Sequence, residues 1–116
     1  MVQSRTAIAE GFSRHVFAPT YEHFADPVRW VNVGGETYTG REAVVAACDR
    51  AAAYFATVDS DVGVVRTIEG ADVVVVESLG RYVDSDGTSS VASCDLYEYS
   101  GDRLVSITSY NVEVQP

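Results

Sequence analysis

The stretch SCDLYEYSGDRLVSI, residues 93–107, predicts a β-hairpin whose first strand has two different faces. Alternate residues of a strand point to opposite faces, so one face carries Ser93, Asp95, Tyr97 and Tyr99. If this face looks at solvent, Asp95 is an ordinary surface acid. If it looks into a cavity, Asp95 is the best candidate in the chain for chemistry.

The hairpin belongs to a longer stretch of sequence in which the residue pattern repeats every two residues, as in β-strands. Four strands are predicted over residues 58–70, 72–84, 89–99 and 103–114, with turns at Gly70-Ala71, Asp86-Gly87 and Gly101-Asp102. Before them we expect helices over 4–17 and 41–56, a short helix from Pro19, and a strand over 28–33. Helices followed by a strand meander predict a single α+β domain, 1–116, with helices on one face of an antiparallel sheet.

The turns decide what lies beside Asp95. An Asp86-Gly87 turn places Asp95 opposite Ser78, with Val76 on the same face. The last turn allows two registers. A three-residue loop puts Ile107, Ser109 and Asn111 on the face of Asp95. A two-residue loop puts Ser106, Thr108 and Tyr110 there instead.

Composition excludes several classes of function. The net charge is −9, and all eight basic residues are arginine, which argues against nucleic acid or an anionic membrane as partner and excludes a lysine Schiff base. With only two histidines and two cysteines, the composition argues against a structural zinc site, and we expect no metal. The N-terminus has no basic flank with a continuous apolar run, so we expect a cytoplasmic protein.

The segment YEHFADPVRWVNVGGETYTGREAV, residues 21–44, resembles the signature of the SnoaL-like, NTF2-like superfamily. In that pattern Phe-Ala-Asp ends a short helix, a strand follows, and Gly-Arg-Glu-Ala-Val begins the next helix. The resemblance extends over about residues 15–115. It implies a cone-shaped fold in which N-terminal helices pack on a strongly curved sheet, and it implies relatives that include isomerases, epoxide hydrolases and polyketide cyclases.

Comparison with the ketosteroid isomerases implies a role for Asp95. The stretch 94–99 matches the strand that carries their protonated acid, and Asp95 takes the place of that acid, a donor in the oxyanion hole. In these isomerases an apolar site keeps that carboxylic acid neutral. Asn32 stands where the isomerase has its catalytic aspartate base, and the first helix lacks the isomerase tyrosine.

The limonene-epoxide hydrolases are similar at the first strand. Trp30-Val31-Asn32 followed by the Gly40 helix start resembles their Tyr-x-Asn, whose phenol and amide hold the attacking water. Their Asp-Arg-Asp set is absent, because Glu77 and Leu79 stand nearest to its Arg-x-Asp part and Ser109 takes the place of the last aspartate. Asn32 is therefore expected to be a polar group of the pocket.

His15 lies on the apolar stripe of the first helix and is the imidazole expected to reach the cavity. We therefore expect catalytic roles for Asp95, His15 and Asn32, with His15–Asp95 as a candidate dyad. A packed core histidine is the alternative. The expected substrate contacts are Trp30, Tyr97, Tyr99, Tyr82, Val76, Ile107 and Ser109. Each aromatic residue among them has a core role as the alternative.

These residues predict a cofactor-free enzyme that binds a small hydrophobic carbonyl- or epoxide-bearing molecule and uses acid/base catalysis. The alternative is a binding or dimerisation module without turnover, or an accessory subunit of the same fold. The outer sheet face is too apolar to leave in water, so we expect a homodimer through it. That face carries Val75, Leu79, Val83, Ala92, Cys94 and Leu96.

Overall fold

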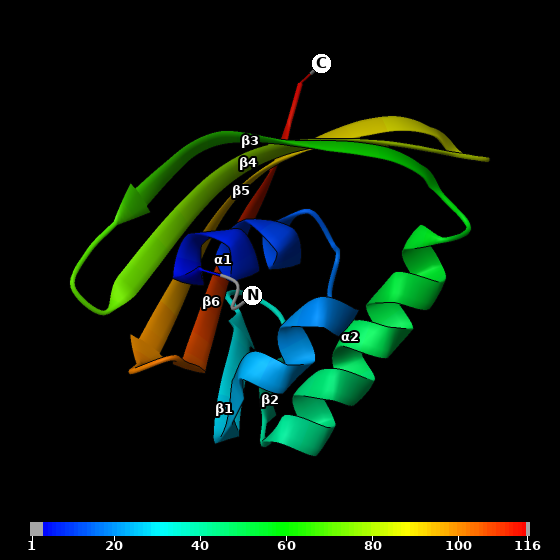
Figure 1. Ribbon diagram of the computed structural model, residues 1–116. Coiled ribbons are helices and arrows are strands. Elements are labelled where there is room, and N and C mark those ends of the chain that lie inside the picture. Colours follow the sequence, from blue (N-terminus) through cyan, green and yellow to red (C-terminus); the bar gives the residue numbers. More distant parts are fainter. Residues whose placement is uncertain (1–3, 116) are drawn as a thin grey trace.

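A computed structural model describes residues 4–115 and shows helices lying in the hollow of one strongly curved sheet (Figure 1). The helices are α1 (Arg5–Ser13), the 3₁₀ helix η1 (Ala18–His23) and α2 (Arg41–Phe55). The strands are β1 (Phe24–Asn32), β2 (Thr37–Thr39), β3 (Asp59–Glu69), β4 (Val73–Asp84), β5 (Gly87–Ser100) and β6 (Arg103–Val114). The α+β class and the cone-shaped arrangement predicted from the sequence are confirmed.

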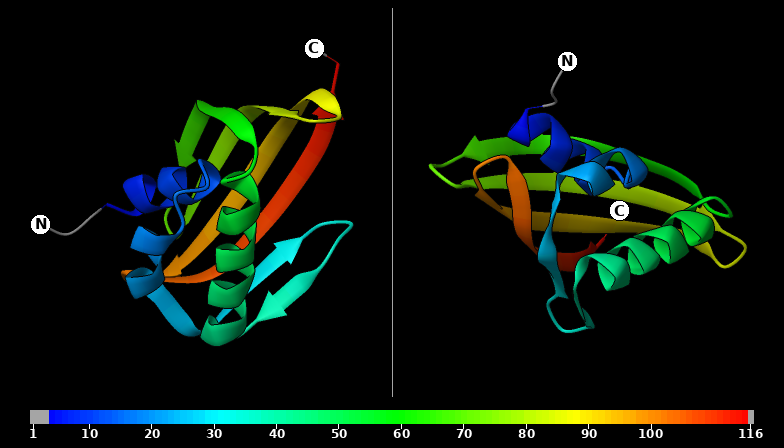
Figure 2. Two further views of the ribbon diagram at one scale, coloured as in Figure 1. Left: turned by 90° about the vertical axis from the view of Figure 1, so that its right-hand side faces the viewer. Right: turned by 60° about the horizontal axis from the view of Figure 1, so that its bottom comes forward.

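The sheet has the strand order β2-β1-β6-β5-β4-β3. Every neighbouring pair is antiparallel except β1 and β6, which run parallel. All three helices lie on the concave face, and the views of Figure 2 show the opposite face of the long strands uncovered. No helix in the described part of the chain is long and apolar enough to cross a membrane.

The first helix is shorter than its periodicity predicted. Ser4 caps its start by accepting a hydrogen bond from the Ala7 amide at 3.1 Å. After Ser13 the chain turns, and the amides of His15 and Val16 donate to the carbonyls of Phe12 and Gly11 at 2.9 Å each. These two bonds form a Schellman motif, and His15 takes its left-handed position with φ 68°. The apolar stripe beyond residue 13 therefore belongs to a loop.

The hairpin of β4 and β5 corrects one expected register. Asp84 pairs with Gly87, so Ser85 and Asp86 form the loop, one residue earlier than Asp86-Gly87. The pairing shifts by two residues, and Asp95 lies opposite Val76 rather than Ser78. A shift of two keeps every side chain on its face, so Asp95 still points to the concave side.

The last hairpin combines both turns considered from the sequence. Ser100 pairs with Arg103, which leaves a two-residue loop, but the register changes between Glu98 and Tyr99 because one extra residue lies in β6. This bulge restores the face expected from the longer loop. Asp95 pairs with Ser109, Tyr97 with Ile107, and Ser93 with Asn111.

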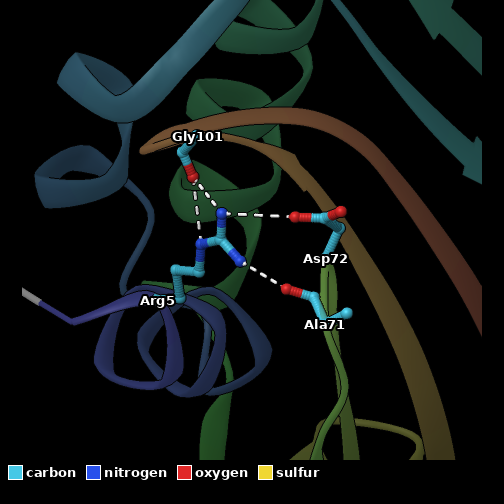
Figure 3. A network of polar contacts seen from close by, with 4 residues as sticks. All are labelled: Arg5, Ala71, Asp72 and Gly101. Atoms are coloured by element: carbon cyan, nitrogen blue, oxygen red, sulfur yellow. Dashed lines mark hydrogen bonds and ion pairs between the residues drawn. The ribbon is translucent and has the colours of Figure 1, made fainter.

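Arg5 attaches α1 to the end of the sheet (Figure 3). Its guanidinium donates to the carbonyl oxygens of Gly101 and, at 3.0 Å, of Ala71, so it joins the β5–β6 and β3–β4 turns. Its charged carbon also lies 5.1 Å from the ring centroid of Tyr99, whose hydroxyl donates to the Arg5 carbonyl at 2.9 Å. One side chain therefore joins the start of α1 to two turns of the sheet.

Arg5→Ala is expected to lower the free energy of unfolding by about 1–2 kcal/mol, because two turns lose a charged donor and Tyr99 loses its cation. Urea unfolding measures the effect. The ion pair with Asp72 spans 3.6 Å, and Asp72 is 74% exposed, so Asp72→Asn serves as control with a change below about 0.5 kcal/mol. Equal losses in the two variants would contradict this role of Arg5.

Candidate functional site

A cavity of about 430 Å³ lies between the concave face of the sheet and the helices. Its helix side is mainly aromatic, while its sheet side presents serine, asparagine and aspartate side chains. The lining residues are Phe12, Ser13, His15, Phe17, Trp30, Asn32, Ala51, Tyr54, Phe55, Val62, Ser78, Tyr82, Asp84, Ser89, Val91, Ser93, Asp95, Ser109 and Asn111. An aromatic wall that faces hydroxyl, amide and carboxyl groups can bind a small molecule with both apolar and polar parts.

Asp95 is held on the cavity wall by hydroxyl groups. The Ser13 hydroxyl donates to its Oδ2 at 2.8 Å. Since Ser13 uses its proton there, the Tyr97 hydroxyl, 2.6 Å away, donates to the Ser13 oxygen. The result is a chain of donors from the buried Tyr97 through Ser13 to a carboxyl group that is 7% exposed.

Ser109 completes the surroundings of Asp95 from the paired strand. Its hydroxyl oxygen accepts a hydrogen bond from Trp30 Nε1 at 3.1 Å, which leaves its own proton for Asp95. Burial raises the pKa of Asp95, and hydrogen bonds from the Ser109 and Ser13 hydroxyls oppose the rise without cancelling it. Asp95 therefore holds its proton to a higher pH than an ordinary aspartate.

His15 lies at the same cavity but has other partners. Its Nε2 is 2.9 Å from the Tyr82 hydroxyl, and its ring stacks on Phe55 with centroids 4.0 Å apart. Burial lowers the pKa of His15 to about 4, so the imidazole is neutral at pH 7. A histidine at a backbone position that favours glycine costs folding energy, and such strain is concentrated at functional sites.

Tyr82 lies flat on the sheet because Gly80 has no side chain. A Cβ atom at Gly80 would come within 2.6 Å of the Tyr82 hydroxyl and 2.8 Å of two ring carbons. The ring of Tyr82 also stacks on Phe55, with centroids 5.8 Å apart. Gly80, Phe55 and His15 together hold the phenol over the cavity.

The His15 ring is expected to show no titration near pH 6.5 in the folded protein, because its pKa is about 4. The unfolded chain binds a proton near pH 6.5 and the folded chain does not. The free energy of unfolding therefore falls as the pH is lowered from about 6.5 to about 4. Proton NMR of the ring and urea unfolding at several pH values measure the two effects.

His15→Asn is the matched variant for this titration, because asparagine tolerates the left-handed backbone and carries no charge in this range. It should lose this part of the pH dependence of stability. A His15 resonance that titrates near 6.5, or an unchanged pH dependence in the variant, would contradict the burial argument.

The family model for the SnoaL-like domain matches residues 6–107 of the chain. The chain belongs to the SnoaL-like family. An NTF2-like protein of unknown function from Cytophaga hutchinsonii has 27% identity and a TM-score of 0.86, over 92% of this chain and 95% of that one. No curated protein matches the chain.

Two further solved structures show the same fold at lower identity. An epoxide hydrolase from M. tuberculosis resembling limonene-epoxide hydrolase has 15% identity and a TM-score of 0.69, over 91% of this chain and 80% of that one. A protein from Jannaschia sp. CCS1 assigned as a SnoaL-like polyketide cyclase has 13% identity and a TM-score of 0.74, over 96% and 90%. Proteins named as an epoxide hydrolase and as a polyketide cyclase thus share the fold of this chain.

The structure brings six of the expected site residues of this SnoaL-like chain to one cavity. They are Asp95, His15, Asn32, Trp30, Tyr82 and Ser109. The other four expected contacts lie in the core, not on the cavity wall: Tyr97, Tyr99, Val76 and Ile107. The reason is α1, which covers this part of the sheet, with the Phe12 ring centroid 5.8 Å from that of Tyr97.

The expected His15–Asp95 dyad is replaced by two separate pairs. His15 is hydrogen-bonded to Tyr82, and Asp95 is hydrogen-bonded to Ser13. The Schellman turn after α1 explains the difference, because it carries His15 toward Phe55 of α2 while Ser13, two residues earlier, stays against β5.

Sequence reasoning missed Ser13 as the main partner of Asp95. The sequence could have indicated this role, because Ser13 lies on the apolar stripe of α1, four residues after the fully buried Ala9. It also missed the cavity end formed by Tyr54, Phe55 and Asp84, because Asp84 has the sequence context of an ordinary turn acid. Among the described residues no three His, Cys, Asp or Glu side chains come together as a metal site.

Proposed function

We propose that this SnoaL-like chain is a cofactor-free enzyme that binds a small hydrophobic molecule with a carbonyl or epoxide oxygen and uses Asp95 for acid/base catalysis. The observation that carries the proposal is a buried carboxyl group with a raised pKa on the wall of an aromatic cavity. A neutral carboxylic acid can donate to a ligand oxygen as negative charge develops on it. Ser13 and Ser109 would hold Asp95 in position for this step.

Asn32 and Tyr82 have supporting roles in the proposed site. An amide does not abstract a proton, but it donates and accepts hydrogen bonds, so Asn32 would hold a water molecule or a ligand oxygen. If neutral His15 carries its proton on Nε2, it donates to the Tyr82 oxygen, and the phenol proton is then a second donor on the same cavity. His15 would therefore act through Tyr82 as a positioning residue.

Hydrogen exchange at a ketone tests the chemistry without the natural substrate. The probe is 1-tetralone in D₂O. Its protons next to the carbonyl exchange when Asp95 donates a proton to the oxygen and a water molecule takes a proton from the adjacent carbon, because the enol that forms regains a deuteron from solvent on the way back. We expect exchange above the buffer rate, and a loss of about 10²–10⁴-fold of the protein-catalysed rate in Asp95→Asn. Asp86→Asn, a change in the β4–β5 loop, is the control and should keep the rate.

Binding measured in parallel separates an enzyme from a binding module. The wild type should bind 1-tetralone more tightly than tetralin, which has the same ring skeleton without the oxygen. Asp95→Leu should remove this difference, because it removes the donor. Binding without exchange would favour the module, and no preference for the ketone would reject Asp95 as its donor.

We further propose that a second copy of the chain covers the outer sheet face. Exposed apolar side chains gather there: Ile68, Leu79, Tyr110 and Val112, with 47–61% of each exposed. The same face carries the Arg66–Glu77 ion pair at 3.1 Å. A twofold axis could therefore place Arg66 of one copy opposite Glu77 of the other.

Leu79→Arg is expected to convert a dimer to a monomer, because it places a charge at the centre of the apolar face. Light scattering after size-exclusion chromatography measures the mass. Val16→Arg, at a residue 53% exposed on the α1–η1 loop, is the control and should leave the mass unchanged. A wild-type chain that is monomeric at high micromolar concentration would reject the dimer.

A further inference from the structure

The cavity is lined by acidic residues and by no arginine. All eight arginines lie in the described part of the chain, and none of them lines the cavity. Five have contacts elsewhere: Arg5 at two turns, Arg66 with Glu77, Arg50 over the Tyr38 ring, and Arg41 and Arg103 with backbone oxygens. The others, Arg14, Arg29 and Arg81, are exposed.

The ionisable groups that do line the cavity are acids, phenols and one imidazole. Asp95 lies at the buried end, and Asp84 lies at the end of β4 near the β4–β5 loop. His15 brings no positive charge at neutral pH, because burial lowers its pKa to about 4. A ligand with a carboxylate or phosphate would meet no cation and one or two carboxyl groups there.

The end of the cavity near Asp84 also has aromatic faces. Tyr54 and Phe55 lie 5.5 Å apart between ring centroids at the C-terminal end of α2, and Phe55 lies 5.8 Å from Tyr82. Asp84 is two residues from Tyr82, so both point to the same side of β4. One Asp84 oxygen accepts a hydrogen bond from the Asp86 amide at 2.8 Å, and among the described residues the other oxygen has no hydrogen-bond donor.

We propose that the ligand carries a cationic amine, and that its ammonium group binds among Tyr54, Phe55, Tyr82 and Asp84. Aromatic faces attract a cation through their quadrupole, and a carboxylate adds a direct charge interaction. The ligand would be amphipathic, with a positive group at this end and an oxygen near Asp95. The placement of the oxygen rests on the proposed function, whereas the ammonium site rests on the cavity itself.

A matched pair of probes separates charge from shape. Choline and 3,3-dimethylbutan-1-ol have nearly the same shape, but only choline is charged, and 3,3-dimethylbutanoate supplies a related anion. We expect choline to bind about tenfold or more tightly than the alcohol and the carboxylate to bind weakest. Titrations followed by ¹H–¹⁵N NMR give affinities and show whether the amides of β4 and the end of α2 respond.

Variants distinguish choline binding at this site from the general attraction of a cation to an acidic protein. Asp84→Asn and Asp86→Asn remove the same charge two residues apart, but only Asp84 lines the cavity. We expect Asp84→Asn to weaken choline about three- to tenfold and Asp86→Asn less than twofold. Phe55→Leu should weaken choline even at 0.5 M salt, where attraction between exposed charges is screened.

Three results would overturn the inference: equal binding of choline and the alcohol, equal effects of Asp84→Asn and Asp86→Asn, or loss of all choline binding at high salt. These results are distinguishable from failure of the proposed function. If 1-tetralone exchanges its protons through Asp95 while choline does not bind, the cation site is rejected and the proposed function stands. If choline binds selectively while 1-tetralone neither binds nor exchanges, the cation site stands and the proposed function is rejected.

Discussion

Phe12→Ala is expected to lower the free energy of unfolding by about 3–5 kcal/mol, the usual cost of emptying a buried phenylalanine site. Phe12 is 3% exposed and lies edge-on to three aromatic rings, with centroid distances of 4.9 Å to Phe17, 5.2 Å to Trp30 and 5.8 Å to Tyr97. These rings come from the α1–η1 loop, β1 and β5. The variant therefore loosens the contact between α1 and two strands at once.

Urea unfolding followed by fluorescence of Trp30 would measure this loss. Phe12→Leu fills most of the site and should cost less than half as much, while Val16→Ala at an exposed loop position should change stability by less than about 0.5 kcal/mol. The loss is a large part of the 5–15 kcal/mol typical of a domain, so a folded but weakened protein is expected. A cost near 1 kcal/mol would mean that Phe12 is not central to the core.

Asp95→Asn is expected to raise the melting temperature at pH 7, although the same change removes the proposed acid. Burial raises the pKa of Asp95 in the folded chain above the unfolded value of about 3.9. Below pH 3.9 the carboxyl group is protonated in both states and has no effect. As the pH rises above it, the unfolded chain ionises more readily than the folded one, and the free energy of unfolding falls.

The stabilisation by Asp95→Asn should therefore be absent below about pH 3.9, grow above it, and level off once the folded carboxyl has ionised. Melting temperatures of wild type and variant across this range test the sign, and subtraction removes the opposite contribution of His15. Asp86→Asn, at an exposed turn residue, should show no such growth. A variant less stable than the wild type at pH 7 would mean that the hydrogen bonds of the carboxylate outweigh its burial.

Much of the fold could be predicted because local patterns agree with the tertiary structure. The period of two over residues 58–114 gave the four long strands, and the helix over 41–56 ends within one residue of its predicted end. The strand β2 (Thr37–Thr39) was not predicted, since three residues carry too short a pattern. The parallel pairing of β1 with β6 was not predicted either, because it joins distant segments.

The candidate site was predicted in part. Alternation placed Asp95 on the concave face, and this conclusion held despite a two-residue error in register, since a shift of two preserves the face. The alternation of residues along a strand does not show whether a side chain on the concave face lines the cavity or is covered by a helix. Tyr97 and Asp95 share a face, yet Tyr97 lies under Phe12 and only Asp95 reaches the cavity.

The sequence by itself determined the α+β class, the family, and the face on which Asp95 stands, because these depend on local periodicity and on the segment 21–44. Only the tertiary structure decided that Ser13 donates to Asp95, that His15 pairs with Tyr82, and where the cavity ends. These contacts join side chains 67 and 82 residues apart in the chain. Their geometry depends on how one helix ends and how two turns set the register, which no local pattern specifies.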